Sequence, residues 1–239
     1  MNTHILITGA AGGIGAVTAR MAAQRGSAVT LMARASGRGE ADKLAAEIVE
    51  AGGKALVVIA DVSNEDEVVA AFQSAVETLG PLSGVVNAAG ITANAWVKDL
   101  DAGLADKVMK INVVGLMVCC REALRHMSTS SGGQGGSIVN VSSMAATIGG
   151  RPGASVYAAS KAAVDTFTTG PAREAAAEGV RVNSIRPGMI ATKMTANLDA
   201  NPELLKALEA SIPMGRRGQP EEIAELALWL LSPAASFVT

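Results

Sequence analysis

The stretch "ILITGAAGGIG" (residues 5–15) runs from a continuous apolar segment directly into Gly9, Gly13 and Gly15, and an Ala-rich segment follows. Glycines at a strand-to-helix turn let the backbone bend sharply and approach a ligand closely. The free N–H groups of the helix that begins there can bind a pyrophosphate. The alternative is a tight turn that simply needs glycine. However, these glycines follow the first strand of a βαβ series, and this position favours a dinucleotide-binding loop.

Short apolar runs alternate with Ala-rich segments along the rest of the chain. Continuous apolar runs, rather than alternating ones, are typical of strands that helices cover on both faces. The runs predict strands at 4–8, 28–33, 54–60, 84–89, 137–143 and 180–187, and helices near 13–25, 39–51, 64–79, 102–128, 155–178 and 220–231. This order predicts one α/β domain over 1–239, a doubly wound Rossmann-like fold with a parallel sheet. The Ser- and Gly-rich segment 128–136 is expected to be a surface loop.

Composition excludes several classes of protein. The 239 residues are 49% hydrophobic and carry a net charge of -2, with no basic run that would bind nucleic acid. No membrane span or signal peptide is apparent in the sequence, and we expect a cytoplasmic protein without a nucleic-acid or membrane partner. Cys119 and Cys120 are adjacent and the two histidines are far apart. We therefore expect neither a disulfide nor a metal site.

The residues after the second strand bear on which dinucleotide binds. An NAD site usually has an acidic residue about 20 positions after the glycines, whereas an NADP site has arginine near the 2′-phosphate. No acidic residue lies between Gly15 and Glu40, and Arg34 follows the second strand. Arg38 is as well explained by a solvated surface charge. The pattern favours NADP(H), with Arg34 on the phosphate.

"YAASK" (157–161) contains the only tyrosine of the chain. Tyr157 and Lys161 are four residues apart on a predicted helix and so share one face. A free phenol titrates near pH ~10, and a neighbouring ammonium together with the positive ring of an oxidised nicotinamide lowers that pKa. An isolated pair of this kind would more often be a surface contact. The surrounding motifs favour a role in proton transfer.

Seven motifs in order make the chain resemble the short-chain dehydrogenase/reductase family over nearly its whole length. They are "TGAAGGIG" (8–15), "DV" (61–62), "NAAG" (87–90), "KINVVG" (110–115), "VSS" (141–143), "YAASK" (157–161) and "RPGMIAT" (186–192). The resemblance implies that Tyr157 is the general acid or base, that Lys161 lowers its pKa and holds the nicotinamide ribose, and that Ser143 polarises the substrate carbonyl. It implies that Asn112 supports a water chain to the lysine. The cofactor residues it implies are Gly9, Gly13, Ile14, Gly15, Asp61, Val62, Asn87, Ala89, Gly90, Ile190 and Thr192.

Several of these positions have plainer interpretations. Asp61 could serve only to begin the next helix, for which Ser63 is the better predicted N-cap. Asn87 could satisfy backbone groups at a strand end. Ser142 competes with Ser143, and the resemblance favours the second serine of the pair.

The chain departs from the family pattern in three places. "NAAG" stands where a second asparagine is more common, and Pro171 should bend or break the helix that carries Tyr157. The sequence ends at "SPAASFVT", where relatives continue into a last edge strand. We expect either a shortened sequence or a sheet with one strand fewer.

The expected activity is NADP(H)-dependent reduction of a small or medium carbonyl compound, or oxidation of the corresponding alcohol. Alternatives are a 3-oxoacyl-thioester reductase, for which Arg216 and Arg217 give slight support, a sugar dehydrogenase, and a catalytically silent NADP-binding regulator. Segment 193–218 is expected to form a substrate lid. The long Ala-rich helices suggest a homo-oligomer, and the resemblance implies a tetramer.

Overall fold

A parallel sheet of six strands forms the centre of the computed structural model, which describes residues 3–239. The strand order is β3-β2-β1-β4-β5-β6, and all pairs are parallel. The strands are β1 (His4–Thr8), β2 (Ala28–Ala33), β3 (Lys54–Ile59), β4 (Gly84–Asn87), β5 (Gly136–Val141) and β6 (Val180–Ile185). The order reverses between β1 and β4, the position at which doubly wound sheets bind ligands. The predicted fold class is confirmed.

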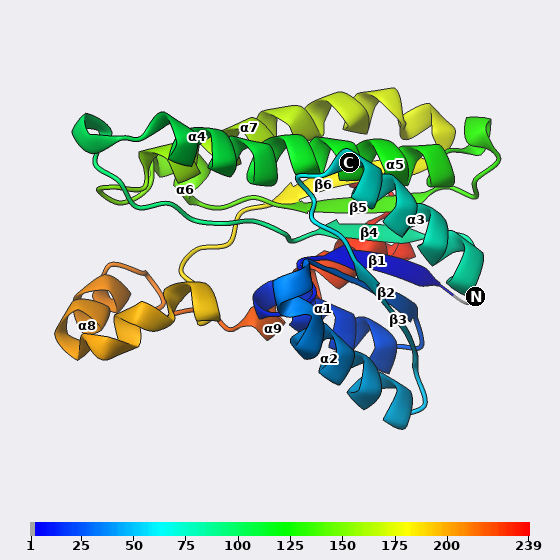
Figure 1. The fold of residues 1–239 in the computed structure, drawn as a ribbon, viewed down its shortest axis with the longest axis horizontal. Helices are drawn as coiled ribbons and strands as arrows, with labels where there is room; N and C mark the ends of the chain where they lie inside the picture. Colours follow the sequence, from blue (N-terminus) through cyan, green and yellow to red (C-terminus); the bar gives the residue numbers. More distant parts are fainter. Residues whose placement is uncertain (1–2) are drawn as a thin grey trace.

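Helices cover both faces of the sheet (Figure 1). One face packs against α1 (Gly13–Gln24), α2 (Arg38–Glu50) and α9 (Pro220–Leu231), and the other against α3 (Glu65–Leu79), α5 (Leu116–Met127) and α7 (Ser155–Glu174). Alternate residues of β1 enter different cores, since Leu6 belongs to the core under α3, α5 and α7 while Ile5 and Ile7 belong to the other. Burial on both faces explains the continuous apolar runs.

The long helix expected over 102–128 is three segments. It consists of α4 (Ala102–Met109), a π-helical segment (Lys110–Gly115) and α5. Gly115 lets this chain approach the backbone after β3, since a Cβ there would lie 2.6 Å from the Val62 carbonyl oxygen. A π turn inside a helix often marks a functional site, and this one carries Asn112.

Of two local expectations, one is narrowed and the other is wrong. The helix with Pro171 does not break there, because α7 runs on to Glu174, and a 3₁₀ turn (Ala176–Glu178) completes the expected range. Asn64, not Ser63, is the N-cap of α3: its side chain accepts a hydrogen bond from the Glu67 amide. The hydroxyl of Ser63 instead donates to Asp61 Oδ1 at 2.6 Å, which removes it from competition for the cap.

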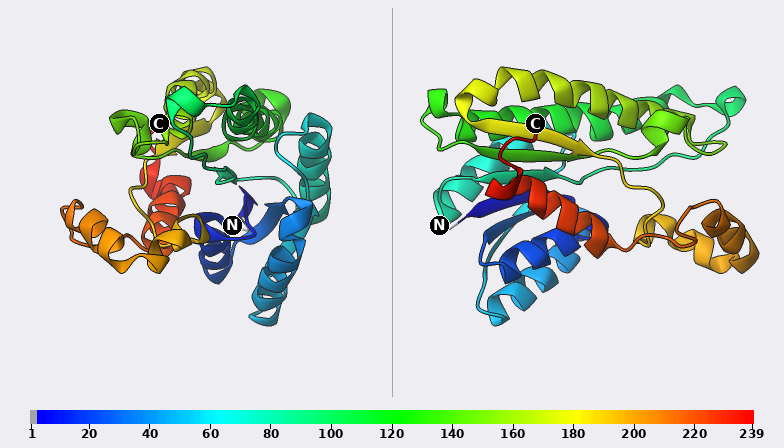
Figure 2. Two further views of the ribbon diagram at one scale, coloured as in Figure 1. Left: turned by 60° about the vertical axis from the view of Figure 1, so that its left-hand side comes forward. Right: turned by 180° about the vertical axis from the view of Figure 1, so that it is seen from behind.

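A small subdomain stands away from the main body beyond the carboxyl ends of the strands (Figures 1 and 2). It comprises a 3₁₀ segment (Lys193–Ala200) and α8 (Pro202–Ala210), and it coincides with the expected lid. The final residues lie beside β6, where the Val238 carbonyl accepts hydrogen bonds from Arg181 and Asn183. Within residues 3–239 no helix combines the length and apolar character that a membrane crossing needs.

Candidate active site

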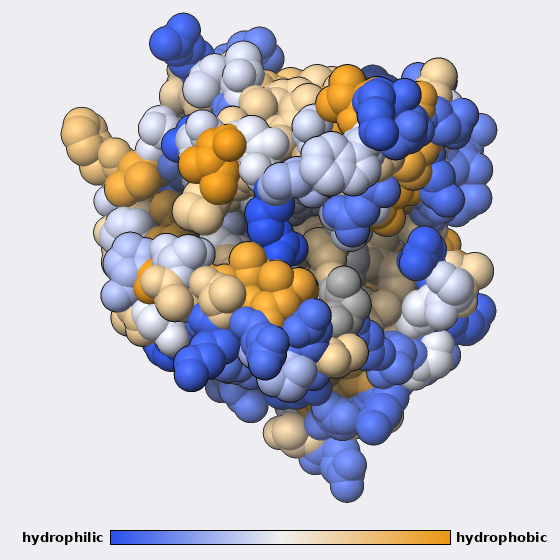
Figure 3. All heavy atoms as spheres, turned by 90° about the vertical axis from the view of Figure 1, so that its left-hand side faces the viewer, coloured by the Kyte–Doolittle hydropathy of each residue, from blue (hydrophilic) through white to orange (hydrophobic). Residues whose placement is uncertain are grey.

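A cleft of about 610 Å³ lies at the carboxyl ends of the strands. Figure 3 looks onto this face, which is hollowed between polar and apolar side chains. Of the residues predicted to bind cofactor or substrate, the cleft is lined by Gly9, Gly13, Ile14, Gly15, Arg34, Asp61, Val62, Ala89, Gly90, Ser143, Tyr157, Lys161, Ile190 and Thr192. A second cavity, at the opposite end of the sheet, contains none of them.

Two glycines of the loop, Gly9 and Gly15, pack so closely on neighbouring backbone that a side chain would not fit there. Gly9 has φ +69°, and a Cβ there would lie 2.9 Å from the Ala89 backbone. A Cβ on Gly15 would lie 2.6 Å from the Gly9 carbonyl oxygen. Thr8 Oγ1 accepts a hydrogen bond from the Ala89 amide at 3.1 Å, which joins the ends of β1 and β4. Glycine at these two positions lets the loop lie close to the end of β4 and turn into α1, the arrangement in which backbone N–H groups can bind a pyrophosphate.

The cleft beyond β2 is lined by groups of both charges. Arg34 is exposed and forms no ion pair with any residue in 3–239. Glu40 also lines the cleft, and Lys193 Nζ lies 3.0 Å from its carboxylate. This contact lowers the pKa of Glu40 and connects the first residue of the lid to α2. Arg38 pairs instead with Asp42 along the surface of α2, at 3.5 Å, as its plainer interpretation predicts.

Asp61 has features of both predicted roles, shaping the turn before α3 and lining the cleft. Its carboxylate accepts hydrogen bonds from the Ser63 amide and hydroxyl, so it does shape the turn before α3. These contacts, chiefly the hydroxyl, lower the pKa of Asp61, and the nearby charge of Arg34 acts in the same direction. The residue nevertheless lines the cleft, so it is available to a nucleotide as an ionised acceptor.

Lys161 is buried beneath the cleft in the middle of α7. Only 5% of the residue is exposed, and Nζ donates a hydrogen bond to the Val141 carbonyl at 2.8 Å. Nζ also lies 5.8 Å from the centre of the Tyr157 ring. Burial lowers the pKa of Lys161 to about 8, while the negative charge of Asp165 opposes this shift. The ammonium is therefore close enough to neutrality to exchange its proton near physiological pH.

The pKa of Tyr157 differs from the expectation that it would fall. Burial raises the pKa of the phenol, and a hydrogen bond with the Ser143 side chain only partly opposes the rise. Removing a phenolate from water disfavours the charged form, and in the protein alone this outweighs the effect of the hydrogen bond with Ser143. At neutral pH the hydroxyl accordingly holds its proton, as a proton donor must.

The two adjacent serines have separate surroundings. Ser142 is buried, and its hydroxyl donates to the backbone carbonyl of Lys161 at 3.0 Å, which fixes α7 to the end of β5. Ser143 is only partly buried, lines the cleft and contacts Tyr157. Of the two, only Ser143 presents its hydroxyl beside the phenol.

Asn112 and Asn87 are buried, and neither lines the cleft. The amide of Asn112 accepts from the Ile91 amide at 2.8 Å and donates to the Ile91 carbonyl at 2.9 Å. Asn112 therefore holds the segment after β4, which begins near Gly90, from the side away from the cleft. Asn87 donates to Asn140 Oδ1 at 2.9 Å, between β4 and β5. The Asn87 amide also donates to Cys120 Sγ at 3.3 Å, so the hydrogen bonds of its side chain go to other side chains and not to the backbone groups that the plainer interpretation named.

Other cleft residues belong to no motif that we singled out. Among them are Ser36, Glu40, Ile91, Lys193 and Met194, all of which line the cleft. Most follow the end of a strand or begin the lid, so a search of every strand end for cleft-lining positions could have found them. Their residue types alone carry no such signal.

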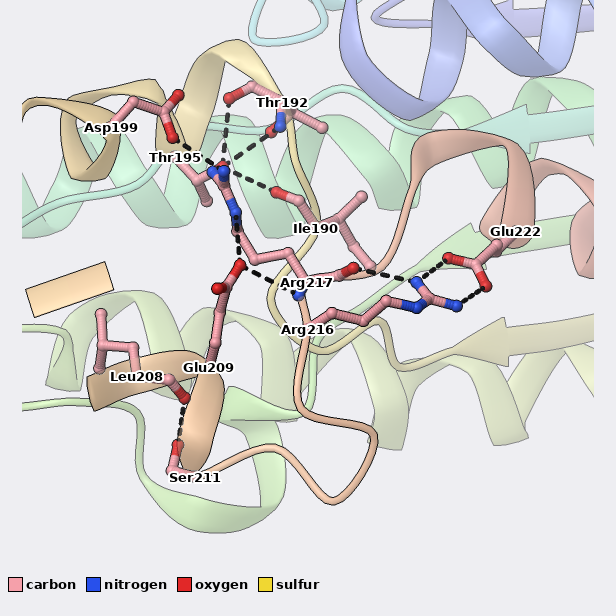
Figure 4. Close-up of polar contacts among 10 residues, drawn as sticks. All are labelled: Ile190, Thr192, Thr195, Asp199, Leu208, Glu209, Ser211, Arg216, Arg217 and Glu222. Atoms are coloured by element: carbon pink, nitrogen blue, oxygen red, sulfur yellow. Dashed lines mark hydrogen bonds and ion pairs between the residues drawn. The ribbon is translucent and has the colours of Figure 1, made fainter. Parts of the chain in front are cut away.

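Two consecutive arginines hold segment 193–218, the expected lid, through contacts with α9 and within the segment (Figure 4). Arg216 contacts both carboxylate oxygens of Glu222 on α9, at 2.8 and 2.7 Å. Arg217 turns the other way and pairs with Asp199 at 2.8 Å and Glu209 at 3.4 Å in the lid. Both guanidinium groups are therefore paired with carboxylates of the protein itself.

The arrangement is suited to proton transfer at a carbonyl oxygen. Tyr157 supplies an acidic hydroxyl, Ser143 a second hydroxyl, and Lys161 a positive charge behind the phenol. Two donors directed at one oxygen stabilise the negative charge that develops when a carbonyl is reduced. The backbone cradle at Gly9 and Gly15, which a Cβ would fill, fits a dinucleotide on the same side.

Comparisons with known proteins agree with this geometry. A family model described as enoyl-(acyl carrier protein) reductase matches residues 9–239. The uncharacterized oxidoreductase YgfF of Escherichia coli is 45% identical over 98% of this chain and 94% of its own. The cis-4-hydroxycyclohexanecarboxylate dehydrogenase of Sinomonas cyclohexanicum is 41% identical over 98% of this chain and 90% of its own.

A solved structure of similar shape is that of an actinorhodin polyketide ketoreductase variant with NADPH. It superposes with a TM-score of 0.92 at 31% identity, and the match covers all of this chain and 93% of the ketoreductase chain. The match extends over every element that builds the cleft. By sequence and by fold, this chain belongs to the short-chain dehydrogenase/reductase family of oxidoreductases.

Proposed function

We propose that the protein is an NADP(H)-dependent reductase of small or medium carbonyl compounds, which also oxidises the corresponding secondary alcohols. The observation that carries the proposal is the meeting of Tyr157, Ser143 and Lys161 in a cleft whose other end holds an arginine without an ion pair among residues 3–239. A catalytically silent regulator would not need this complete set.

The cofactor supplies or accepts the hydride when it is bound. Its pyrophosphate would be held by Gly9, Gly13, Ile14 and Gly15. Its adenine would contact Asp61 and Val62, and its carboxamide would contact Ile190 and Thr192. Tyr157 donates the proton to the carbonyl oxygen during reduction and accepts it during oxidation. Ser143 orients that oxygen, and Lys161 holds the ribose and favours the phenolate once the proton has left.

Arg34 supports NADP(H) over NAD(H). A guanidinium without a carboxylate partner is available for a bidentate contact with a 2′-phosphate. Two acidic residues line the cleft near Arg34. Lys193 partly neutralises Glu40, and the carboxylate of Asp61 accepts hydrogen bonds from Ser63. The NADPH of the similar ketoreductase structure is consistent with this choice.

The 3-oxoacyl-thioester alternative loses the observation that favoured it. Arg216 and Arg217 are engaged with Glu222, Asp199 and Glu209, so they offer little free charge to an acidic carrier. The description of the family model still favours testing such substrates. We also propose that segment 193–218 acts as a lid over the substrate. We propose further that the protein is a homo-oligomer and acts in the cytoplasm.

The test is a panel of cyclic and linear ketones, sugars and acyl thioesters, with NADPH and NADH oxidation followed by absorbance at matched ionic strength. We expect turnover with ketones and a preference for NADPH. Turnover confined to acyl thioesters would replace the substrate class, and no turnover with any carbonyl compound would overturn the proposal.

A further inference from the structure

Asp165 carries a largely buried carboxylate that the reaction described above does not use. It lies on α7 one helical turn after Lys161 and two after Tyr157, so the three side chains follow one face of the helix. Its side chain is 10% exposed, and Oδ2 accepts a hydrogen bond from Arg186 Nε at 2.7 Å. Within residues 3–239 the other oxygen, Oδ1, is buried without a hydrogen-bond partner. Such a group costs stability, which makes a purely structural reason for it weak.

Arg186 occupies a position that connects the catalytic elements. It is the first residue after β6 and precedes Pro187 and Gly188, which line the cleft. On one side of it the Ile185 carbonyl accepts a hydrogen bond from the Ser142 amide at 2.8 Å. On the other side the Pro187 carbonyl accepts one from the Met144 amide at 2.9 Å. The backbone on both sides of Ser143 is therefore bonded to the stretch that Asp165 holds.

We propose that Asp165, together with Arg186, is a positioning residue of the active site: it ties the helix of Tyr157 and Lys161 to the strand end that aligns Ser143, and it places a negative charge one turn behind the Lys161 ammonium. The proposal rests on the proposed function for its kinetic consequences only. Its electrostatic consequence, a lysine kept charged in a buried site, belongs to the protein alone.

Few charged groups compete with Asp165 at this site. On α7 itself the other titratable neighbour is Tyr157, which is neutral at pH 7, and α5 contributes the Cys120 thiol, whose pKa burial raises to about 12. The π-helical segment and β5 contribute the neutral groups of Asn112 and the Val141 carbonyl. The loop after β6 contributes Arg186, while α6 (Ala145–Ile148) has no charged residue and Asp106 and Lys107 of α4 are exposed.

The decisive variant is Asp165→Asn, which removes the charge while a carboxamide oxygen can still accept from Arg186. The titration of Lys161 is followed by the ¹³Cε resonance in ¹³C-lysine-labelled protein, and Lys161→Met assigns the signal. We expect the midpoint to fall by about half a unit to one pH unit in Asp165→Asn. An unchanged midpoint in the folded variant overturns the proposal.

Arg186→Gln gives a prediction of opposite sign. Without the guanidinium the Asp165 charge is less neutralised, so the Lys161 midpoint should rise, and Arg186→Lys should leave it near the wild-type value. If Asp165→Asn fails to fold, Arg186→Gln carries the test alone, and a midpoint that falls or stays there overturns the proposal. Glu174→Gln is the matched control, because it removes an exposed carboxylate from the same helix and should shift nothing.

Kinetics then separate positioning from general damage. The alkaline limb of kcat against pH should move in Asp165→Asn in the direction of the Lys161 midpoint, and Asp165→Glu should restore it. A uniform loss of kcat at every pH, without a shift, would show a merely structural role and overturn the proposal. A wild type without carbonyl reductase activity would instead overturn the proposed function, while the ¹³C titration would still decide the role of Asp165.

Discussion

Burial moves the pKa values of two single residues, Tyr157 and Lys161, in opposite directions. It raises the pKa of the phenol and lowers that of the ammonium to about 8, because in each case it disfavours the charged form. The phenol therefore keeps its proton at neutral pH until the reaction requires it. As the pH rises through about 8 the Lys161 charge is lost, so a step that needs this charge should slow above that pH.

Arg34→Ala tests the choice of cofactor at the same scale. If Arg34 makes a charge-assisted contact with the 2′-phosphate, its removal should cost ~1.5–3 kcal/mol of NADPH binding. That is roughly a ten- to hundred-fold increase in the NADPH dissociation constant. NADH lacks the phosphate and should bind almost unchanged.

Dissociation constants of both cofactors, measured at matched ionic strength, provide the check. Arg38→Ala is the control, because Arg38 is already paired with Asp42 on the surface of α2. Ala33→Asp combined with Arg34→Ala should invert the preference by adding an acceptor for the ribose hydroxyl and a charge that repels the phosphate. Equal losses for NADH and NADPH, or a wild type that already prefers NADH, would be incompatible with NADP(H) specificity.

The segment after β4 lies close to both the π-helical segment and α7. A Cβ on Gly90 would lie 3.2 Å from Asn112 Oδ1 and 3.5 Å from Lys161 Nζ. Gly90→Ala should therefore push back the Asn112 amide, which lies beside Lys161, and reduce kcat by about ten-fold, since small misplacements at an active site are costly. Gly39→Ala is the matched control, because a Cβ there has no neighbour within 4 Å.

Steady-state kinetics together with thermal unfolding distinguish the two effects. We expect Gly90→Ala to lose kcat with a small change in Tm, and Gly39→Ala to keep kcat. Wild-type kcat in Gly90→Ala would show that the contact between the β4 end and the π-helical segment does not position Lys161 for the proposed reaction.

How much the sequence could predict differs between elements. The six strands, the glycine loop and the Tyr157–Lys161 helix follow from apolar runs and spacing, which are local properties. The π-helical segment at 110–115 could not be read from the sequence, because it depends on Gly115 meeting the Val62 backbone from another element. The predicted N-cap of α3 was wrong because Asp61 engages the Ser63 hydroxyl.

The active site shows the same division. Most motif residues line one cleft, whereas the side-chain directions of Asn87 and Asn112 depend on partners more than 20 residues away. The direction of the Tyr157 pKa shift depends on burial, which emerges only when the helices pack. Asp165 and Arg186 belong to no predicted role, and only their contact across α7 and β6 reveals them.

At the scale of the whole molecule, apolar side chains remain exposed near the carboxyl-terminal end. Leu226 and Trp229 on α9 are each 44% exposed, and Phe237 is fully exposed. Exposed apolar groups of this size favour association of subunits. We expect light scattering after size exclusion to give about four times the 24.1 kDa of the chain.

Trp229→Glu should reduce that mass by placing a charge in the contact. Glu221→Gln at the exposed start of α9 is the control and should leave the mass unchanged. A wild-type mass of a single chain at micromolar concentration would contradict the expected oligomer without affecting the assignment of the active site.

The central claim is that the single tyrosine of the chain transfers the proton, and Tyr157→Phe tests it most directly. The substitution keeps the ring and removes only the hydroxyl, so NADPH should bind as in the wild type. Because a positioned general acid contributes on the order of 10²–10⁴-fold, kcat for ketone reduction should fall by about that factor. The measurement is kcat by NADPH absorbance beside the NADPH dissociation constant by fluorescence. A large loss of kcat with unchanged cofactor binding is the predicted result, and a Tyr157→Phe enzyme with the wild-type rate would contradict the account.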